Sequence, residues 1–302
     1  MLARAVQSYL SVRQAAGFEL RLVSFHLRSF ASYSDAKGER YVRARTAIEW
    51  ARRVPSVRQR ARRLADVIRF ARHMLSEDAR HEVPPAIFGS EKGPRPPPYI
   101  LSEEQVRELI ELTSRSNYRK MYGETYSTLF ALLSCTGLRI SEAIRLRYDD
   151  ITPDGLVIRT SKYRRSRLVP LHPSARDGLE RYLQLRRPYA PLDDHVFVSW
   201  PRRPIGRKGI QRAFQLAVKQ MGLPTGRGKR RPTPHSLRHG FAVRALQTCP
   251  DGRDQITQHT LMLSTALGHS SAAYTYWYLE AVPELMRSIS DRCEAYVAGA
   301  TP

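Results

Sequence analysis

The chain has 302 residues, 42% of them hydrophobic, which is enough for one or two packed domains and excludes wholesale disorder. Lysine and arginine number 50 against 28 aspartate and glutamate residues, a formal net charge of +22. Such an excess repels itself in a compact state unless a polyanion neutralises it, so nucleic acid is the leading partner, ahead of an acidic membrane surface or a merely solvated basic surface.

The first 85 residues are predicted to form a small all-helical domain. Helical periodicity runs over residues 2–16, 20–33, 46–53 and 57–75, without a convincing strand. The last of these segments carries six arginines, opposed only by Asp66. We expect it to contact DNA phosphates through Arg58, Arg62 and Arg69, although a solvated helix face is the plainer interpretation.

The composition changes at residues 83–99, which are rich in proline and contain two glycines. Proline fixes its own φ and disfavours helix in the residue before it. We therefore predict a helical domain over residues 1–85, a linker over 86–100 and a catalytic domain over 101–302.

The second domain opens at Ser102 with a capping box that Gln105 completes. Further helices are predicted over residues 128–135, 141–147, 174–185 and 207–221. Residues 156–159 and 167–171 are short β-rich runs joined by a polar segment, which predicts a hairpin. The predicted fold class is mainly α with a small β-sheet, in two domains.

Cutting a phosphodiester without a metal ion requires cations for the nonbridging oxygens, a nucleophile and a proton donor for the leaving oxygen. Arginine suits the first task, because its planar fork offers paired donors and never deprotonates. Arg139 follows Thr136-Gly137-Leu138 at the start of a predicted helix, a natural anion site, and Lys162 lies at the hairpin turn. Taken singly, either residue is more often an ordinary surface side chain.

Residues 233–240 read T-P-H-S-L-R-H-G, so His235, Arg238 and His239 recur at helical spacing and can face one pocket. A metal site is the alternative for the two histidines, but no glutamate follows His235 as in a zinc protease motif, and no metal ion is expected. The cysteines also form no C-x-x-C pair. The basic loop before this block and the hairpin turn supply further candidate phosphate contacts: Arg227, Lys229, Arg230, Arg231, Arg164 and Arg165.

Residues 256–279 contain no charged side chain, yet their many Thr, Ser, Gln and His residues argue against a membrane span. We expect a buried segment beside an active site. Its last part, L-G-H-S-S-A-A-Y-T-Y-W-Y-L, holds Tyr274, Tyr276 and Tyr278. Aromatic clusters are generally core, and composition alone does not single out one tyrosine.

These blocks resemble the tyrosine recombinase (phage integrase) family, whose catalytic half reads T-G-x-R-x-x-E, a hairpin lysine, H-x-x-R-H, and L-G-H with a tyrosine nine residues later. The resemblance runs from Tyr99 to about Glu284, and residues 1–85 would correspond to the family's helical core-binding domain. The matching positions are Arg139, Lys162, His235, Arg238, His269 and Tyr278.

The resemblance implies that Tyr278 attacks the scissile phosphorus and forms a 3′-phosphotyrosine with a free 5′-hydroxyl. Arg139 and Arg238 would clamp the nonbridging oxygens, and Lys162 would protonate the leaving 5′ oxygen.

The remaining roles are also implied by the family. His235 would assist proton transfer at the tyrosine or orient the phosphate, and His269 would donate a hydrogen bond to the phosphate. Glu142 would hold the first arginine in place, and His239 is expected only to support the site.

The implied enzyme is a site-specific DNA strand transferase that serves integration, excision or transposition of a mobile element. One ester is exchanged for another, so neither ATP nor another cofactor is expected. The expected partners are double-stranded DNA, a synaptic tetramer of the chain on DNA, and accessory recombinases or DNA-bending proteins. The expected setting is a bacterial-type cytoplasm, near the nucleoid and not in a membrane.

The sequence leaves two rival functions open. One is an architectural DNA-binding protein that kept the fold, although a pure binder needs neither Tyr278 nor Lys162. The other is a metal-dependent nuclease with Asp149, Asp150 or Glu142 as ligands. A type IB topoisomerase shares the chemistry, but the separate helical domain favours strand exchange.

Overall fold

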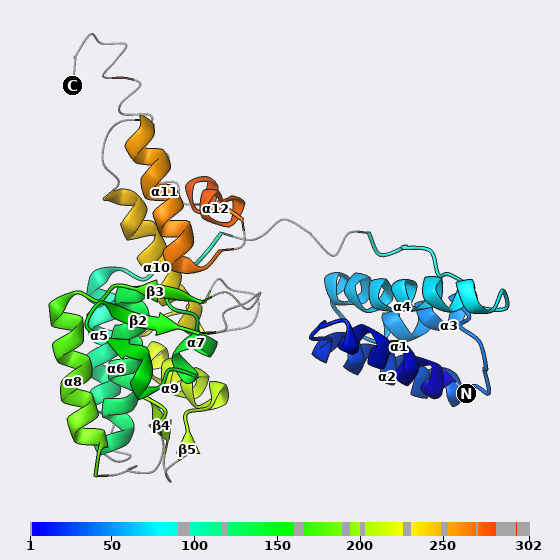
Figure 1. Cartoon of the computed structure of the whole chain (residues 1–302), viewed down its shortest axis with the longest axis horizontal. Coiled ribbons are helices and arrows are strands. Elements are labelled where there is room, and N and C mark those ends of the chain that lie inside the picture. Colours follow the sequence, from blue (N-terminus) through cyan, green and yellow to red (C-terminus); the bar gives the residue numbers. More distant parts are fainter. Residues whose placement is uncertain are drawn as a thin grey trace. The chain divides into compact units, whose positions relative to one another are not determined.

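The computed structural model describes residues 2–89, 97–115, 120–159, 166–188, 194–199, 203–225, 231–248, 253–269, 271–281 and 294. It is mainly helical with a small sheet, which confirms the predicted fold class (Figure 1). The chain divides into two compact units, Met1–Arg95 and Pro96–Pro302.

Within residues 2–89 the first unit forms four helices: α1 (Leu2–Ala15), α2 (Arg21–Asp35), α3 (Ala44–Arg52) and α4 (Val57–Glu77). Each lies within two residues of its predicted range, because each buries one periodic apolar face in a shared core around Phe30, Trp50 and Phe70. The longest of the four, α4, is capped by Ser56, whose hydroxyl accepts a hydrogen bond from the backbone N–H of Gln59.

Four of the arginines on α4 share one exposed helix face, and we call them the arginine stripe: Arg58, Arg62, Arg69 and Arg72. Two others turn inward, since Arg60 donates to the carbonyl of Val54 at 2.7 Å and Arg63 lies over the ring of Trp50. Asp66 does oppose these charges, since it pairs with Arg69, but it does so from a buried position. Its carboxylate is only 3% exposed and binds His26 Nδ1 at 2.6 Å, as well as Arg69.

The described part of the second unit contains two small sheets among its helices. Its elements are α5 (Glu103–Ser114), α6 (Lys120–Thr136), α7 (Ile140–Ile144), η1 (Tyr148–Asp150), β1 (Ile151–Thr152), β2 (Gly155–Ile158), β3 (Arg167–Val169), α8 (Pro173–Arg186), β4 (Val198–Ser199), β5 (Arg203–Pro204), α9 (Arg207–Gln220), α10 (Pro234–Gln247), α11 (Arg253–Leu267) and α12 (Ala273–Ala281). The predicted capping box is present, with both Ser102–Gln105 hydrogen bonds formed.

The predicted hairpin is confirmed: β2 and β3 pair antiparallel with Leu156 opposite Val169, and β1 extends the sheet on the other side of β2. The helix predicted over residues 141–147 is shorter, because the carboxylate of Asp150 accepts a hydrogen bond from the backbone N–H of Arg147 and binds Arg159. These contacts turn the chain into the unpredicted strand β1. The preceding helix, α6, begins at Lys120, eight residues before its predicted start at residue 128.

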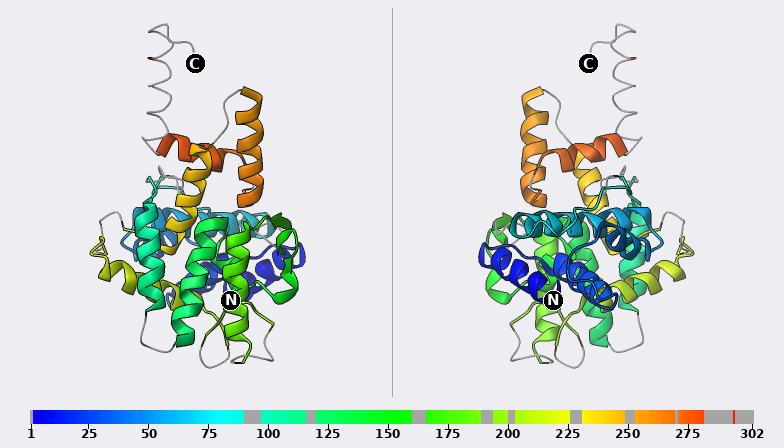
Figure 2. Two further views of the ribbon diagram at one scale, coloured as in Figure 1. Left: turned by 90° about the vertical axis from the view of Figure 1, so that its left-hand side faces the viewer. Right: turned by 90° about the vertical axis from the view of Figure 1, so that its right-hand side faces the viewer.

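Helices α10, α11 and α12 pack against one another, with α12 running across the other two (Figure 2). Their shared core contains Val243, Leu263, Leu267 and Tyr278. The predicted burial of residues 256–279 is wrong for one face of α11, where Leu261 and Met262 are more than half exposed. This helix packs through Leu263 and Leu267, so the opposite positions face outward. No helix within the described residues is long and apolar enough to cross a membrane.

Candidate active site

The carboxyl end of α11 gathers three arginines from distant parts of the chain, the arginine cluster. Arg167 Nε donates to the carbonyl of Ala266 at 2.8 Å, Arg238 Nη2 to that of Leu267 at 2.7 Å, and Arg139 Nη2 to that of Gly268 at 2.7 Å. The last carbonyls of a helix lack intrahelical partners and form the negative end of its dipole, so they accept from cations. Since the three acceptors belong to consecutive residues, the three guanidinium groups are neighbours.

A buried carboxylate, Glu142 of α7, balances two of these cations. Its Oε1 accepts from Arg139 Nη1 at 2.8 Å and from Arg167 Nη1 at 3.1 Å, and its Oε2 accepts from Arg167 Nη2 at 2.9 Å. Burial alone would raise the pKa of Glu142, but the hydrogen bonds and charges of Arg167 and Arg139 outweigh it and lower the pKa to about 2. The carboxylate is therefore ionised at neutral pH. It faces guanidinium groups, an environment that disfavours its use as a metal ligand.

Arg238 is the most deeply buried arginine of the cluster, 2% exposed, and its Nη1 also donates to the carbonyl of Gly137 at 2.6 Å. Burial lowers the pKa of Arg238 to about 10, and the charge of Arg139 acts in the same direction. Tyr278 and Glu142 act in the opposite direction on this pKa, so these groups share one electrostatic environment. The guanidinium remains charged at neutral pH.

Two glycines with positive φ make this close packing possible. Gly268 has φ +64, and a Cβ there would lie 2.8 Å from Arg167 Nη1 and 3.2 Å from Arg139 Nη1. Gly137 has φ +63, and a Cβ there would lie 2.5 Å from the ring of Phe241. Both positions therefore need glycine for backbone conformation and for space.

Of the three tyrosines on α12, Tyr278 is the one that lies in the site. It is 2% exposed, whereas Tyr274 and Tyr276 are 47% and 49% exposed. Its hydroxyl oxygen lies 2.9 Å from His239 Nδ1. The ring of His269 is stacked on the Tyr278 ring with centroids 6.5 Å apart.

The sequence-based expectation gave His235 one of two tasks, proton transfer at the tyrosine or orientation of the phosphate, and gave His239 a supporting role. The contact to the Tyr278 hydroxyl comes from His239, and the ring of His235 packs edge-on against the His239 ring, with centroids 4.5 Å apart. His269 Nδ1 lies 2.8 Å from the hydroxyl oxygen of Thr275, a buried residue of α12.

The structure thus brings Arg139, Glu142, Arg238, His239 and Tyr278 together, with His235 and His269 against them. Several candidate residues lie outside the described residues and stay predictions: Lys162, Arg164, Arg165, Arg227, Lys229 and Arg230. Arg231 is exposed just before α10, and Arg58, Arg62 and Arg69 belong to the arginine stripe of the first unit.

Sequence reasoning missed Arg167. Its place at the start of a β-rich run is explained by the strand alone, so nothing in the sequence pointed to a further task. Its side chain is only 8% exposed, and its tie to Ala266 spans 99 residues of sequence. Only the folded chain brings these two residues together.

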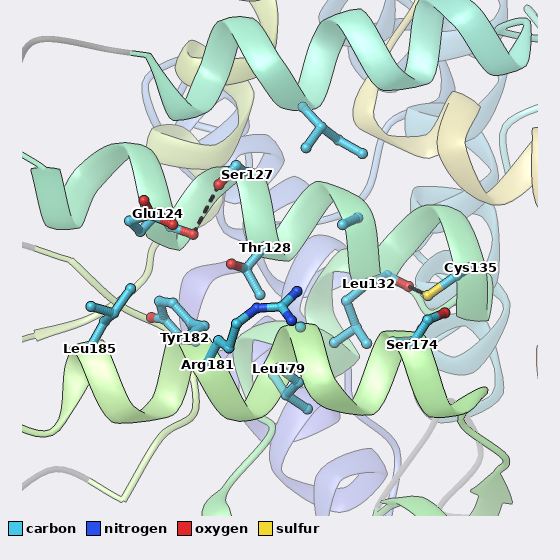
Figure 3. Close-up of a pocket in the computed structure, with 14 residues that line it drawn as sticks. Glu124, Ser127, Thr128, Leu132, Cys135, Ser174, Leu179, Arg181, Tyr182 and Leu185 are labelled. Atoms are coloured by element: carbon cyan, nitrogen blue, oxygen red, sulfur yellow. Dashed lines mark hydrogen bonds between the residues drawn. The ribbon is translucent and has the colours of Figure 1, made fainter.

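A pocket of about 380 Å³ between α6 and α8 is separate from this site (Figure 3). Arg181 points from α8 across it toward α6, and Glu124, Thr128 and Cys135 line the other side. No residue of the arginine cluster lines this pocket, and we assign it no role in the chemistry.

A buried tyrosine beside clustered arginines places a potential nucleophile next to groups that can bind a phosphate. The sequence profile of the phage integrase family matches residues 100–284, and the chain belongs to this family. Its members, the tyrosine recombinases, act as DNA strand transferases.

Curated relatives agree with this assignment. A protein described as an integrase/recombinase, y4rB of Sinorhizobium fredii, is 34% identical over 303 residues, which cover 96% of both chains. The tyrosine recombinase XerD of Proteus mirabilis is 31% identical over 231 residues, 75% of this chain and 69% of XerD.

Solved structures share the fold. The integrase of transposon Tn1549 in complex with transposon right-end DNA superposes with a TM-score of 0.66 at 16% identity, covering 96% of this chain and 98% of that one. A lambda integrase dimer bound to a COC′ core site gives a TM-score of 0.64 at 16% identity, and the match covers 90% of this chain and 96% of that one.

Proposed function

We propose that this recombinase cuts DNA through Tyr278, forms a 3′-phosphotyrosine and rejoins the strand to a new 5′-hydroxyl, in integration, excision or transposition of a mobile element. The observation that carries the proposal is the buried Tyr278 beside the arginine cluster. This arrangement supplies a nucleophile and fixed positive charge within one site. A pure DNA-binding protein needs neither.

In this proposal the guanidinium groups hold the scissile phosphate. A guanidinium has five N–H donors, and the protein contacts described above leave Arg139 and Arg238 further donors for the nonbridging oxygens. The carbonyls and Glu142 fix these donors before DNA arrives, so little reorganisation is needed as charge builds on the phosphorus. In other enzymes one such donor contributes about 3–4 kcal/mol to transition-state stabilisation.

The covalent step balances without an external reactant. Tyr278 Oη forms a bond to phosphorus, the bond from phosphorus to the 5′ oxygen breaks, and Lys162 gives a proton to that oxygen. The phenolic proton passes to a histidine of the site. Rejoining reverses each transfer, so the energy of one ester is kept in the next and no ATP is consumed. His235 and His269 would orient the phosphate.

DNA binding is proposed to extend beyond this site. The arginine stripe offers four exposed cations on one face of α4, suited to backbone phosphates. Exchange between two duplexes involves four strands and therefore four tyrosines, which supports a tetramer on DNA with accessory recombinases or DNA-bending proteins as further partners. Such work would take place at the nucleoid, in the cytoplasm of a bacterial-type cell.

The experiment compares three tyrosine variants on the DNA that flanks the gene. Protein and DNA fragments are incubated in EDTA, denatured, and analysed for covalent adducts, whose attachment sites are then mapped. Tyr278→Phe should form no adduct while its DNA binding stays normal. Tyr274→Phe and Tyr276→Phe, the matched controls, should keep adduct formation.

Two outcomes contradict the proposal. Normal adduct yield from Tyr278→Phe would exclude this residue as the nucleophile. If all DNA cleavage were lost in EDTA and restored by a divalent ion, the result would favour the metal-dependent nuclease.

A further inference from the structure

The hydroxyl of Tyr278 has one contact whose task the family roles leave unassigned. His239 Nδ1 lies 2.9 Å from the oxygen, His239 is 8% exposed and Tyr278 is 2% exposed. We propose that His239 is the base that accepts the phenolic proton when Tyr278 attacks phosphorus. This inference rests on the proposed role of Tyr278 as the nucleophile.

The geometry of the pair suits proton acceptance. In the proposed role the phenol donates its hydrogen to Nδ1, which requires the tautomer of His239 that carries its proton on Nε2. Donor and acceptor are already at hydrogen-bond distance, as a base must be to take a proton in the transition state. Their burial keeps bulk water from competing for the same proton.

The neighbouring histidines are placed for other contacts. His269 Nδ1 lies beside the Thr275 hydroxyl, and its ring is stacked 6.5 Å from the Tyr278 ring. The ring of His235 packs edge-on against the His239 ring, and the tilted ring of Trp277 has its centroid 5.8 Å from that of His239. These contacts hold the His239 imidazole in place from α10 and α12.

Positive charge close to Tyr278 favours the loss of its phenolic proton. Among the described residues, the titratable or charged groups that face the pair are Arg238 and His235 on α10 and His269 just before α12. Behind Arg238 lie the charges of Arg139, Arg167 and Glu142. The guanidinium of Arg238 interacts electrostatically with Tyr278, and its positive charge stabilises a developing phenolate.

The step is balanced at every atom. As Tyr278 Oη bonds to phosphorus, its O–H bond breaks and the proton joins His239 Nδ1, while the bond to the 5′ oxygen breaks and that oxygen is protonated by Lys162. During rejoining the imidazolium returns the proton to the phenol oxygen as the bond from phosphorus to tyrosine breaks.

The test uses His239→Asn on a duplex that spans the phosphate mapped in the adduct experiment. The bridging 5′ oxygen of that phosphate is replaced by sulfur, because a thiolate leaves without a general acid and the assay then reports only on the attacking side. Asparagine places a hydrogen-bond acceptor near the position of Nδ1 but cannot take a proton. Single-turnover adduct formation is followed from pH 6.5 to pH 10.

We expect His239→Asn to react roughly 10²- to 10⁴-fold more slowly than the unaltered chain near pH 7, the usual contribution of a general base. Its rate should rise with pH and approach that of the unaltered chain near the ordinary tyrosine pKa of about 10, since a phenolate needs no base. His172→Asn on the surface is the matched control and should react normally, because asparagine also caps a helix well.

The outcomes are separable. A rate near normal at pH 7, or a slow rate that stays flat with pH, overturns the assignment of His239 as the base. If His239→Asn fails to bind DNA, His239→Gln is measured by the same two criteria. Adducts from Tyr278→Phe would overturn the nucleophile and this inference together, whereas their absence alongside a normal His239→Asn rate overturns this inference alone.

Discussion

The arginine cluster at the end of α11 and the arginine stripe on α4 contain the same residue type in opposite surroundings. Within the cluster, the side chains of Arg167 and Arg139 are 8% and 23% exposed and both bind Glu142. In the stripe, Arg69 is 51% exposed and the other three members are also exposed. The cluster is fixed by the folded chain, whereas the stripe is largely solvated.

This difference separates two uses of positive charge. A buried guanidinium loses its hydration, and only hydrogen bonds and an opposite charge offset that cost, so its position is precise. Fixed donors of this kind stabilise a transition state. Exposed arginines keep most of their hydration, and they add affinity for a polyanion through the release of counterions.

The largest expected effect comes from removing the charge that balances the cluster. Glu142→Gln leaves Arg139 and Arg167 without an anion, and breaking a buried pair in this way costs roughly 3–5 kcal/mol of unfolding free energy. The pKa of Glu142 is lowered to about 2 from an ordinary value near 4.3, so its contribution is complete above about pH 5 and is lost as the pH falls from about 4 toward 2.

Urea unfolding at pH 7 and at pH 3.5 measures this effect. The stability difference between the unaltered chain and Glu142→Gln should be large at pH 7 and smaller at pH 3.5. Glu108→Gln, at an exposed position of α5, is the control and should change stability by less than about 0.5 kcal/mol. A difference that does not depend on pH would mean that Glu142 stabilises through packing and not through charge.

A smaller effect is expected from crowding the cluster without changing its charge. Gly268→Ala would put a Cβ 2.8 Å from Arg167 Nη1 and 3.2 Å from Arg139 Nη1, so both guanidinium groups must shift. We expect single-turnover adduct formation to slow by about 10- to 100-fold, since a misplacement of about 1 Å can reduce a rate that far.

Gly222→Ala is a matched control for the backbone strain that a side chain causes at positive φ. Its φ is +68, and a Cβ there would meet no atom within 4 Å. Both variants therefore incur a backbone strain of roughly 1 kcal/mol, and only Gly268→Ala disturbs the arginines. Equal cleavage rates for the two variants would show that the cluster tolerates displacement.

Much of the fold is readable from the sequence. The four helices of the first unit follow from periodicity because each buries a single stripe of apolar residues in one core. The hairpin at β2 and β3 follows from two β-rich runs. The helix after Arg139 was overestimated, since its end depends on contacts that Asp150 makes with Arg147 and Arg159, and side-chain contacts of this kind leave no periodic pattern.

The site was readable only in part. Motif spacing singled out Tyr278, and the structure places it beside His239 and in the electrostatic environment of Arg238. Motif spacing did not single out Arg167, because its partners lie 25 and 99 residues away in sequence. It also ranked His239 below His235, because neighbouring helical positions look alike until the packing of α12 decides which imidazole meets the tyrosine.

The smallest effect on chemistry should come from the arginine stripe, and it sharpens the comparison with the cluster. In Arg58→Ala/Arg62→Ala two exposed cations are lost, so the slope of log affinity against log salt should become shallower by about 2, near 0.9 for each phosphate contact. Adduct formation at saturating DNA should stay within about twofold of normal, because neither side chain belongs to the cluster.

Arg4→Ala, which removes an exposed cation of α1 outside the stripe, should leave the slope nearly unchanged. An unchanged slope in the double variant would assign the stripe to solvent, whereas a large loss of cleavage at saturation would mean that exposed arginines also take part in the chemistry.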